Sequence, residues 1–442
     1  MAKKSSQNPP ENLEKKAKDS PEKAPGKNAQ EVNKDLEVKS SFKSFGNDAT
    51  KKGGKNAKKA SFTKAQSLGA KKKLPLIYII LGVLIAGALS LGLVYAFGFG
   101  GFSGIVSPLS DGTPITTEPQ EEMVANPLTG EKYSKSEAPW INDRPLAVMV
   151  NNYIDARPQS GLVDADLVYE IVAEGGITRF IPFFLSKTPE KIGPVRSTRD
   201  YYLVLVKELG DAMIMHIGWS PQALEAIETW PVRSLGRGGG SFWRENPRNV
   251  ATEHTAYVNG KDLRELGDEL GWEGTREFPA WQFKDDSPTP LAEGPDSCET
   301  VAALCDPLTI DFWYEGDYSA IFKYNPDNNS YLRFTGYDAN GDPIPHEDQD
   351  TGEQIEVKNV IVQFADESAI EGDTKNRLSY ALVGSGTGLV FLDGTVEEVT
   401  WSKAERDART MFYDLNGEEM QFNRGQFWIS IVPTRNESQV KY

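Results

Sequence analysis

An uncharged apolar run, LPLIYIILGVLIAGALSLGLVYAFGFG, occupies residues 74–100. Because a helix rises about 1.5 Å per residue and the hydrocarbon core of a bilayer is about 30 Å thick, the run is long enough to cross a membrane once. Lys71, Lys72 and Lys73 precede it, and lysine-rich flanks stay cytoplasmic. The sequence therefore predicts a single-pass transmembrane helix, with the long C-terminal part outside. A cleaved signal peptide is the alternative, but its apolar region would span only about 7–15 residues.

The two sides of the apolar run differ in charge. Residues 1–73 contain 19 lysines, no arginine and 8 acidic residues, a net charge of +11; because the whole chain of 442 residues carries −16, the remainder carries −27. Such a tail cannot bury enough apolar surface to offset the entropy of ordering, which predicts a disordered cytoplasmic segment. The tail either stays solvated and fixes the orientation of the chain in the membrane, or it contacts anionic lipid heads. Nucleic acid is disfavoured as a partner, because the tail has no arginine and almost no aromatic residues for bases to stack on.

The remainder of the chain divides into three segments. Residues 101–139 are rich in Gly, Pro, Ser and Thr, which predicts a flexible extracytoplasmic linker. Residues 140–280 alternate strand-like apolar runs with helix signals, which predicts a layered α/β domain with at least one strand–helix–strand crossover. Residues 281–442 contain aromatic-rich runs between turn signals, which predicts a smaller, mainly antiparallel β domain. The predicted fold class is α/β, with a β-rich C-terminal domain and one preceding transmembrane helix.

Two helix starts are visible in residues 140–280. In STRD, Ser197 is a candidate N-cap, and Asp200 three positions later completes a capping box. In SPQALEAIE, Ser220 is a candidate N-cap, and Pro221 takes the first helical position. Ligands of open α/β sheets bind where strands end and helices begin, so both starts are candidate sites.

Two arginines, Arg196 and Arg199, lie at the first of these starts in EKIGPVRSTRDYY, where the helix dipole favours an anion. They either form a site for phosphate or carboxylate, with Arg179 as a third member, or pair with carboxylates such as Glu170 and Glu174. The sequence leaves both alternatives open. The predicted ligand-binding residues are Arg179, Arg196, Ser197, Arg199, Ser220 and Asn152.

Three residues are candidate catalytic groups. Glu170 and Glu174 share a face on either a helix or a strand and could act as an acid and base pair, although pairing with arginine is the simpler interpretation. His216 ends an apolar run and is either a buried core residue or a proton carrier. The motifs GxSxG, HExxH and GxGxxG are absent from the sequence, and we expect neither a metal site nor a cofactor.

The two cysteines, Cys298 and Cys305, lie in PDSCETVAALCDP. On a continuous helix they would be about 10 Å apart, too far for a disulfide, so a bridge requires a turn between them. A bridged loop is favoured over two free thiols, because disulfides persist outside the cytoplasm.

Several segments, among them RPLAVMVNN, ADLVYEIVAEGGITRF, PEKIGPVRSTRDYY and FYDLNGEEMQFNRGQFWISIVP, closely resemble the YerB-like family of bacterial lipoproteins. The resemblance covers roughly residues 139–436. It implies an envelope protein of Gram-positive-type bacteria with an N-terminal and a smaller C-terminal domain, and it implies no defined reaction. The chain departs from the lipoprotein pattern because no cysteine directly follows its apolar run.

Three functions follow as hypotheses. The protein could bind an anionic envelope polymer in an arginine-lined cleft, it could be a hydrolase or transferase acting on that polymer, or it could be a scaffold for a protein partner. Binding is favoured over catalysis, because the sequence contains no complete nucleophile or metal set.

Overall fold

The computed structural model describes residues 121–238, 240–272, 274, 277–287 and 306–442. All of them belong to one compact unit, Thr113–Tyr442. The predicted tail, the apolar run and both cysteines lie outside the described residues. No helix in the described part of the chain is long and apolar enough to cross a bilayer.

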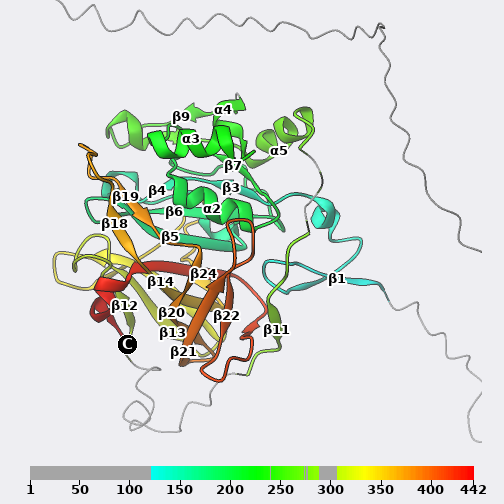
Figure 1. The fold of residues 1–442 in the computed structure, drawn as a ribbon, viewed down its shortest axis with the longest axis vertical. Helices are drawn as coiled ribbons and strands as arrows, with labels where there is room; N and C mark the ends of the chain where they lie inside the picture. Colours follow the sequence, from blue (N-terminus) through cyan, green and yellow to red (C-terminus); the bar gives the residue numbers. More distant parts are fainter. Residues whose placement is uncertain (1–120, 239, 273, 275–276, 288–305) are drawn as a thin grey trace, which may run out of the picture. The chain divides into compact units, whose positions relative to one another are not determined.

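The larger of two sheets has eleven strands and runs through both the N-terminal and the C-terminal part of the chain (Figure 1). Its order is β22 (Met411–Tyr413), β21 (Thr395–Lys403), β20 (Gly384–Leu392), β17 (Asn359–Ala365), β24 (Phe427–Pro433), β5 (Leu167–Glu174), β6 (Ile177–Phe184), β3 (Leu146–Val148), β7 (Met213–Met215) and β8 (Arg233–Ser234), with β4 (Val150–Asn151) beside β6. Strand β24 pairs in parallel with both β17 and β5, so a single sheet crosses the predicted boundary at residue 280.

The smaller sheet has six strands and is mainly antiparallel. It contains β15 (Pro343–Pro345), β14 (Ser330–Tyr337), β13 (Ala320–Asn325), β12 (Leu308–Ile310) and β25 (Val440–Lys441), with β16 (Glu356–Val357) beside β14.

Four further strand pairs lie outside these sheets. They are β1 (Met123–Ala125) with β2 (Lys132–Ser134), β9 (Trp243–Arg244) with β10 (Ala256–Tyr257), β11 (Gln282–Lys284) with β23 (Gln421–Asn423), and β18 (Glu367–Ala369) with β19 (Leu378–Tyr380). The first pair is a hairpin inside the predicted linker, and Asn126 beside it donates a 2.7 Å hydrogen bond to the buried Asp166.

Four α-helices are present among the described residues: α2 (Asp200–Glu208), α3 (Pro221–Thr229), α4 (Leu235–Gly238) and α5 (Gly260–Glu269). Ser220 caps α3 as predicted, because its side chain accepts a hydrogen bond from the N–H of Ala223. The predicted cap of α2 is wrong. Arg199 is its N-cap residue, and Ser197 instead donates to the carbonyl of Ile217 across 2.9 Å.

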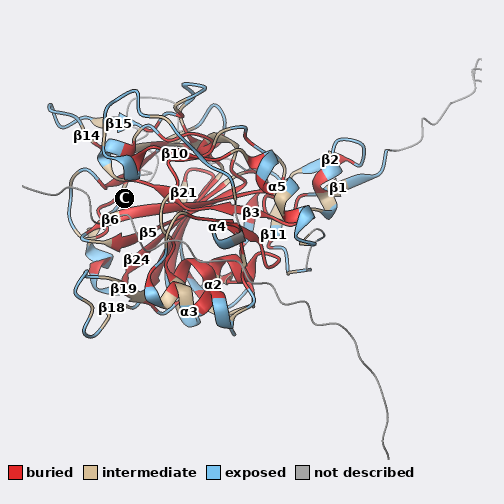
Figure 2. Cartoon of the chain, turned by 90° about the horizontal axis from the view of Figure 1, so that it is seen from above, coloured by how far each residue is buried: buried red, intermediate tan, exposed pale blue. Residues whose placement is uncertain are grey.

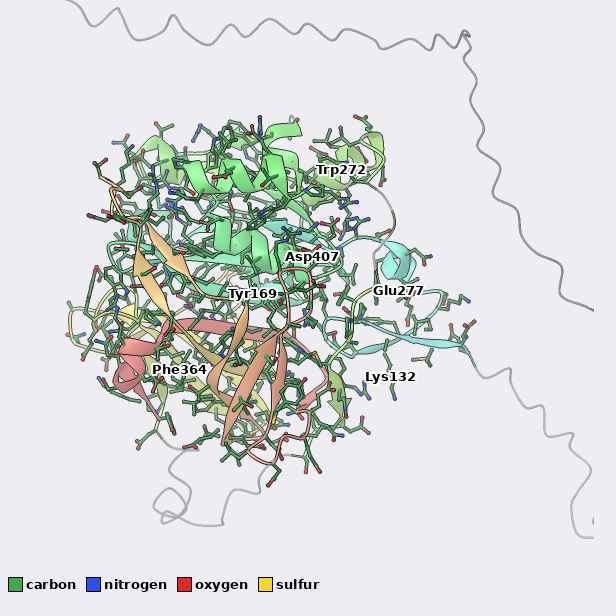
Figure 3. The ribbon with its side chains drawn as sticks, viewed as in Figure 1. Lys132, Tyr169, Trp272, Glu277, Phe364 and Asp407 are labelled. Carbon is green, nitrogen blue, oxygen red and sulfur yellow. The ribbon has the colours of Figure 1, made fainter. Side chains whose placement is uncertain are left out.

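The smaller sheet covers one face of β5 and helix α2 covers the other. Burial on both faces explains the near-continuous apolar sequence of this strand. On one face, Trp428 of β24 packs against Phe180 of β6 and Phe322 of the smaller sheet. On the other face, Tyr202 of α2 donates a 3.0 Å hydrogen bond to the carbonyl of Ile171. Figure 2 shows that buried residues concentrate on these central strands, and Figure 3 places Tyr169 of β5 among them.

The predicted fold class is wrong, because strands predominate in the described residues and the helices are few. One strand–helix–strand unit is present, since β7 and β8 are parallel neighbours connected by α3. Local patterns located several strands and helices, but the neighbours that turn them into one large sheet come from the far end of the chain.

Candidate functional site

A pocket of about 270 Å³ opens beside the N-terminus of α2. We call it the cationic pocket, and its lining residues are Glu174, Arg179, Arg196, Ser197, Arg199, Trp219, Lys375 and Arg377. Five of these side chains are basic and one is acidic. The end of β5, strand β6, the loop before α2, the loop before α3 and the turn between β18 and β19 all contribute.

Backbone hydrogen bonds fix the segment that carries Arg196 and Arg199. The N–H of Arg196 donates to the carbonyl of Met149 across 2.8 Å, and the carbonyl of Arg196 accepts from Ile217 across 3.1 Å. Gly218 adopts a positive φ of 86°, and a side chain there would collide with Ser197. The cations therefore project from a braced segment, because the link between β3 and β4 and the loop before α3 hold it on both sides.

Two of the arginines are clamped by one carboxylate. Glu174 accepts a 2.5 Å hydrogen bond from Arg179 and a 2.6 Å hydrogen bond from Arg199. Both arginines are nearly fully buried, and each donates a further hydrogen bond to a backbone carbonyl. Burial, together with the charge of Arg199, lowers the pKa of Arg179 to about 10, so Arg179 stays charged at neutral pH.

The clamp keeps Glu174 ionised. Burial alone would raise the pKa of its carboxyl, but the charges of Arg179 and Arg199 outweigh burial and lower it. A carboxylate held in this way is a poor proton donor at neutral pH.

Two further cations in the pocket have no such partner. Neither Arg196 nor Lys375 makes a side-chain hydrogen bond or an ion pair to any residue in the described ranges. Arg377 is paired with Asp373 across 2.6 Å. Two carboxylates, Glu174 and Asp373, thus pair with three of the five cations.

The remaining predicted site residues lie outside the cationic pocket. Glu170 is fully buried and accepts hydrogen bonds from Thr178, Arg333 and Trp428. Asn152 is buried and donates to Thr178 across 2.7 Å. These side chains lie on the face of the large sheet that is opposite to the pocket.

His216 and Ser220 are also buried away from the pocket. The Nδ1–H of His216 donates to the carbonyl of Gly218, so Nε2 accepts from the hydroxyl of Ser234 across 2.8 Å. Burial lowers the pKa of His216 to about 4, which leaves the ring neutral at pH 7. Ser220 is occupied as the cap of α3.

Lys375 and Arg377 were not among the residues predicted for the site. A bridge between Glu174 and Arg377 brings this turn of the C-terminal part to the end of β5. The only local signal is DTKNR, an acidic residue four positions before a basic one, and that pattern is common on ordinary surfaces.

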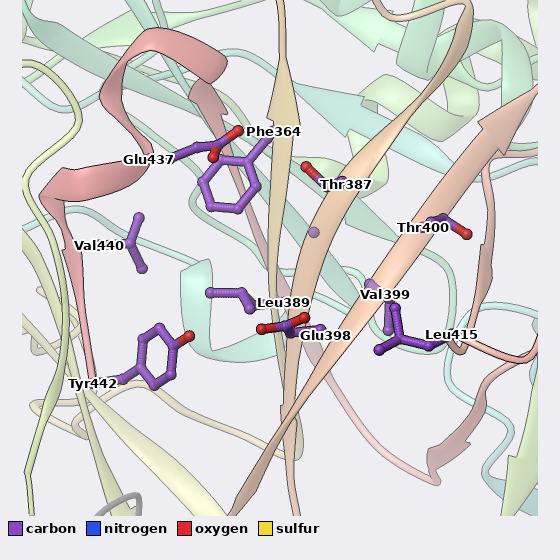
Figure 4. A pocket seen from close by; sticks show the side chains of 11 residues that line it. Phe364, Thr387, Leu389, Glu398, Val399, Thr400, Leu415, Glu437, Val440 and Tyr442 are labelled. Atoms are coloured by element: carbon purple, nitrogen blue, oxygen red, sulfur yellow. The ribbon is translucent and has the colours of Figure 1, made fainter.

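A second hollow lies on β20 and β21 and is shown in Figure 4. Phe364, Leu389 and Tyr442 line it together with the carboxylates of Glu398 and Glu437. Its lining, as far as the structure describes it, contains no basic side chain that could balance an anion.

Together, the fold and the pocket define a β-rich protein with a small, open, positively charged site built from both halves of the chain. Residues 128–273 match the family described as "Protein of unknown function (DUF3048) N-terminal domain", and residues 308–429 match the corresponding "C-terminal domain". The chain belongs to this YerB-like family.

YerB of Bacillus subtilis matches this chain both in sequence and in structure. The protein named "Putative lipoprotein YerB" of strain 168 is 29% identical over 317 residues, which cover 71% of this chain and 88% of that protein. The crystal structure of YerB protein from Bacillus subtilis superimposes with a TM-score of 0.57 at 29% identity, and the match covers 70% of this chain and 96% of that one.

These findings correct the predicted single-pass membrane protein and the localisation that rested on it. The relative is named a "Putative lipoprotein", and the described residues contain no helix that could span a bilayer. The predicted span itself, residues 74–100, lies outside the described residues.

Proposed function

We propose that this protein binds an anionic group of a cell-envelope polymer, a phosphate or a carboxylate, in the cationic pocket. The observation that carries the proposal is the pair Arg196 and Lys375, two unpartnered cations that line one small pocket. The description of the relative as a lipoprotein supports an envelope setting.

The clamped arginines support the same assignment. Arg179 and Arg199 are fixed by Glu174 and by backbone carbonyls, so they supply positive potential without having to be ordered by the ligand. Preorganised charge in a partly buried site attracts an anion more strongly than the same charge in open water. The local positive potential matters because the chain after residue 73 carries a net charge of −27.

Binding is favoured over catalysis by the positions of the acid and base candidates. Glu174 is held ionised by two arginines, whereas Glu170 and His216 do not line the pocket. A proton relay would need at least two such groups within reach of one substrate.

The test is co-sedimentation of the purified full-length protein with bacterial cell-wall sacculi across a salt series. One batch of sacculi keeps its phosphate polymers, and a second batch is stripped of them with hydrofluoric acid. The key variant carries Arg196→Gln plus Lys375→Gln. We expect salt-sensitive binding to the untreated sacculi, because exposed charges are screened within about 10 Å at 0.1 M salt.

A charge-matched control carries Lys132→Gln plus Lys261→Gln. Lys132 projects from the hairpin β1–β2 (Figure 3), and the side chain of Lys261 is 78% exposed on α5. We expect the pocket variant to lose at least tenfold in affinity and the control to keep it, since hydrogen bonds to charged groups contribute about 1.5–3 kcal/mol each. Equal binding by both variants, with circular dichroism showing both folded, would reject the pocket as the polymer site.

A further inference from the structure

Trp219 is exposed at the cationic pocket. Its side chain lines the pocket together with Arg196 and Arg199, and 40% of the residue is accessible to solvent. The ring offers an apolar face beside a charged pocket, and a ligand that covers this face would gain free energy from its burial. Inorganic phosphate alone would gain little from this ring.

The ring and the cations belong to one braced unit. The N–H of Thr198 donates to the carbonyl of Gly218 across 3.1 Å, and the N–H of Ser220 donates to the carbonyl of Thr198 across 3.3 Å. Both bonds use the backbone of Thr198, which lies between Arg196 and Arg199. Their other partners, Gly218 and Ser220, are the two neighbours of Trp219 in the sequence. The indole therefore keeps a fixed offset from the arginines.

Two neighbours orient the indole. His216 meets it edge-on, with the ring centroids 6.0 Å apart and the planes at 88°. The guanidinium of Arg237 lies 5.8 Å from the indole centroid and is itself held by Glu228 across 2.9 Å. The ring is thus positioned before any ligand arrives, which lowers the entropy lost on binding.

We propose that the cationic pocket recognises an acidic sugar unit, a pyranose that carries a phosphate or a carboxylate. The C–H face of the pyranose packs on Trp219, and the anionic group is bound by Arg196 and Lys375. This inference rests on the proposed function and names its ligand class. The volume of about 270 Å³ lies just below the range of roughly 300–1,000 Å³ typical of small-molecule pockets, which suits a single unit rather than a long segment.

The chemistry of the lining favours a sugar over a nucleobase. Five basic side chains offer hydrogen-bond donors, which suit the acceptor oxygens of a sugar and its phosphate. A sugar hydroxyl can accept from these donors and turn its own proton to solvent, whereas the amino and ring N–H groups of a base only donate. Acceptors for such groups are few: Glu174 is already engaged by two arginines, and Ser197 already donates to a carbonyl.

The experiment is calorimetric titration of the full-length protein with five probes: inorganic phosphate, glucose, glucose 6-phosphate, glucuronate and phenyl phosphate. Wild type is compared with Trp219→Ala and with Trp219→Phe, which keeps an aromatic face. We expect glucose 6-phosphate to bind wild type at least tenfold more tightly than inorganic phosphate does. Trp219→Ala should abolish that preference while changing phosphate affinity less than twofold, and Trp219→Phe should keep most of it.

The outcomes separate this inference from the proposed function. Phosphate binding that is lost in Arg196→Gln, without any preference for the sugar phosphate, would overturn the sugar assignment and leave the anion site intact. A tighter, Trp219-dependent affinity for phenyl phosphate would overturn it in favour of an aromatic ligand. If none of the phosphate-bearing probes binds wild type, and glucuronate as a carboxylate probe does not bind either, the proposed function fails together with the inference.

Discussion

Arg199 donates to Glu174 across 2.6 Å, whereas Arg196, three positions earlier on the same loop, makes no side-chain hydrogen bond or ion pair within the described residues. Both side chains line the same pocket. The sequence posed two alternatives for these arginines, carboxylate pairing or an anion site. Pairing is observed for Arg199, and the anion site at Arg196 stays a proposal. Arg199 builds the site, and Arg196 is available to a ligand.

The variant Glu174→Gln removes the carboxylate that pairs with Arg179 and Arg199. We expect the free energy of unfolding to fall by about 3 kcal/mol, because Arg179 and Arg199 keep their buried charges without a counter-ion. Added phosphate should restore part of that loss, since a ligand that binds only the folded state stabilises it. Chemical denaturation with and without phosphate measures both effects. A variant as stable as wild type would show that the clamp is not structural.

The pairing of Glu174 with the two arginines also predicts how the free energy of unfolding changes with pH. The pKa of Glu174 is lower in the folded state than in the unfolded chain, so its contribution to stability is present above the unfolded pKa. That contribution disappears as the pH falls through the folded pKa. The Glu174→Gln variant should therefore lose less stability than wild type between pH 5 and pH 3.

A second buried pair, Glu170 and Arg333, joins the two sheets. Their side chains meet at 2.8 Å, both are fully buried, and they are 163 positions apart in the sequence. Glu170→Gln leaves the charge of Arg333 buried without a carboxylate, so we expect a loss of about 3–5 kcal/mol in the free energy of unfolding. Glu269→Gln, an exposed change at the end of α5, should cost under about 0.5 kcal/mol. Similar denaturation midpoints for both variants would contradict a stabilising role for the pair of Glu170 and Arg333.

His216 should stay neutral in the folded protein. Its pKa of about 4 is below the unfolded value of about 6.5, so as the pH falls the unfolded chain binds the proton first. Stability should therefore decline between pH 6.5 and pH 4, by up to about 1.4 kcal/mol per pH unit from this group. NMR of the imidazole Cε1 proton, assigned with a His216→Gln variant, measures the titration directly. A midpoint near pH 6.5 would show that the ring is accessible and unpartnered.

Glu170 and Glu174 illustrate where inference from sequence ends. On a regular strand residues four apart share a face, which made the two carboxylates a plausible pair. Strand β5, however, shifts register between Val172 and Glu174, and one extra residue turns Glu174 to the opposite face. Nothing in the local sequence marks this bulge beyond the two glycines that follow it.

The pocket shows the same limit at longer range. Arg196, Ser197 and Arg199 could be selected from the sequence, because two arginines before a helix start are a local signal, and Arg179 was predicted as a third member of their site. Lys375 and Arg377 could not, because a bridge between distant segments brings them to the pocket. The fold class failed for a similar reason: strand pairing between β24 and β5 depends on side chains far apart in the sequence, and local periodicity does not encode it.

The central claim is that an anion binds between Arg196 and Lys375. Hydrogen–deuterium exchange of the full-length protein, with and without saturating inorganic phosphate, tests it most directly. We predict that the loop at residues 196–199 and the turn at residues 373–377 become protected together, and that Arg196→Gln removes the protection at both segments. Protection confined to other segments, or protection that persists in Arg196→Gln, would contradict the account.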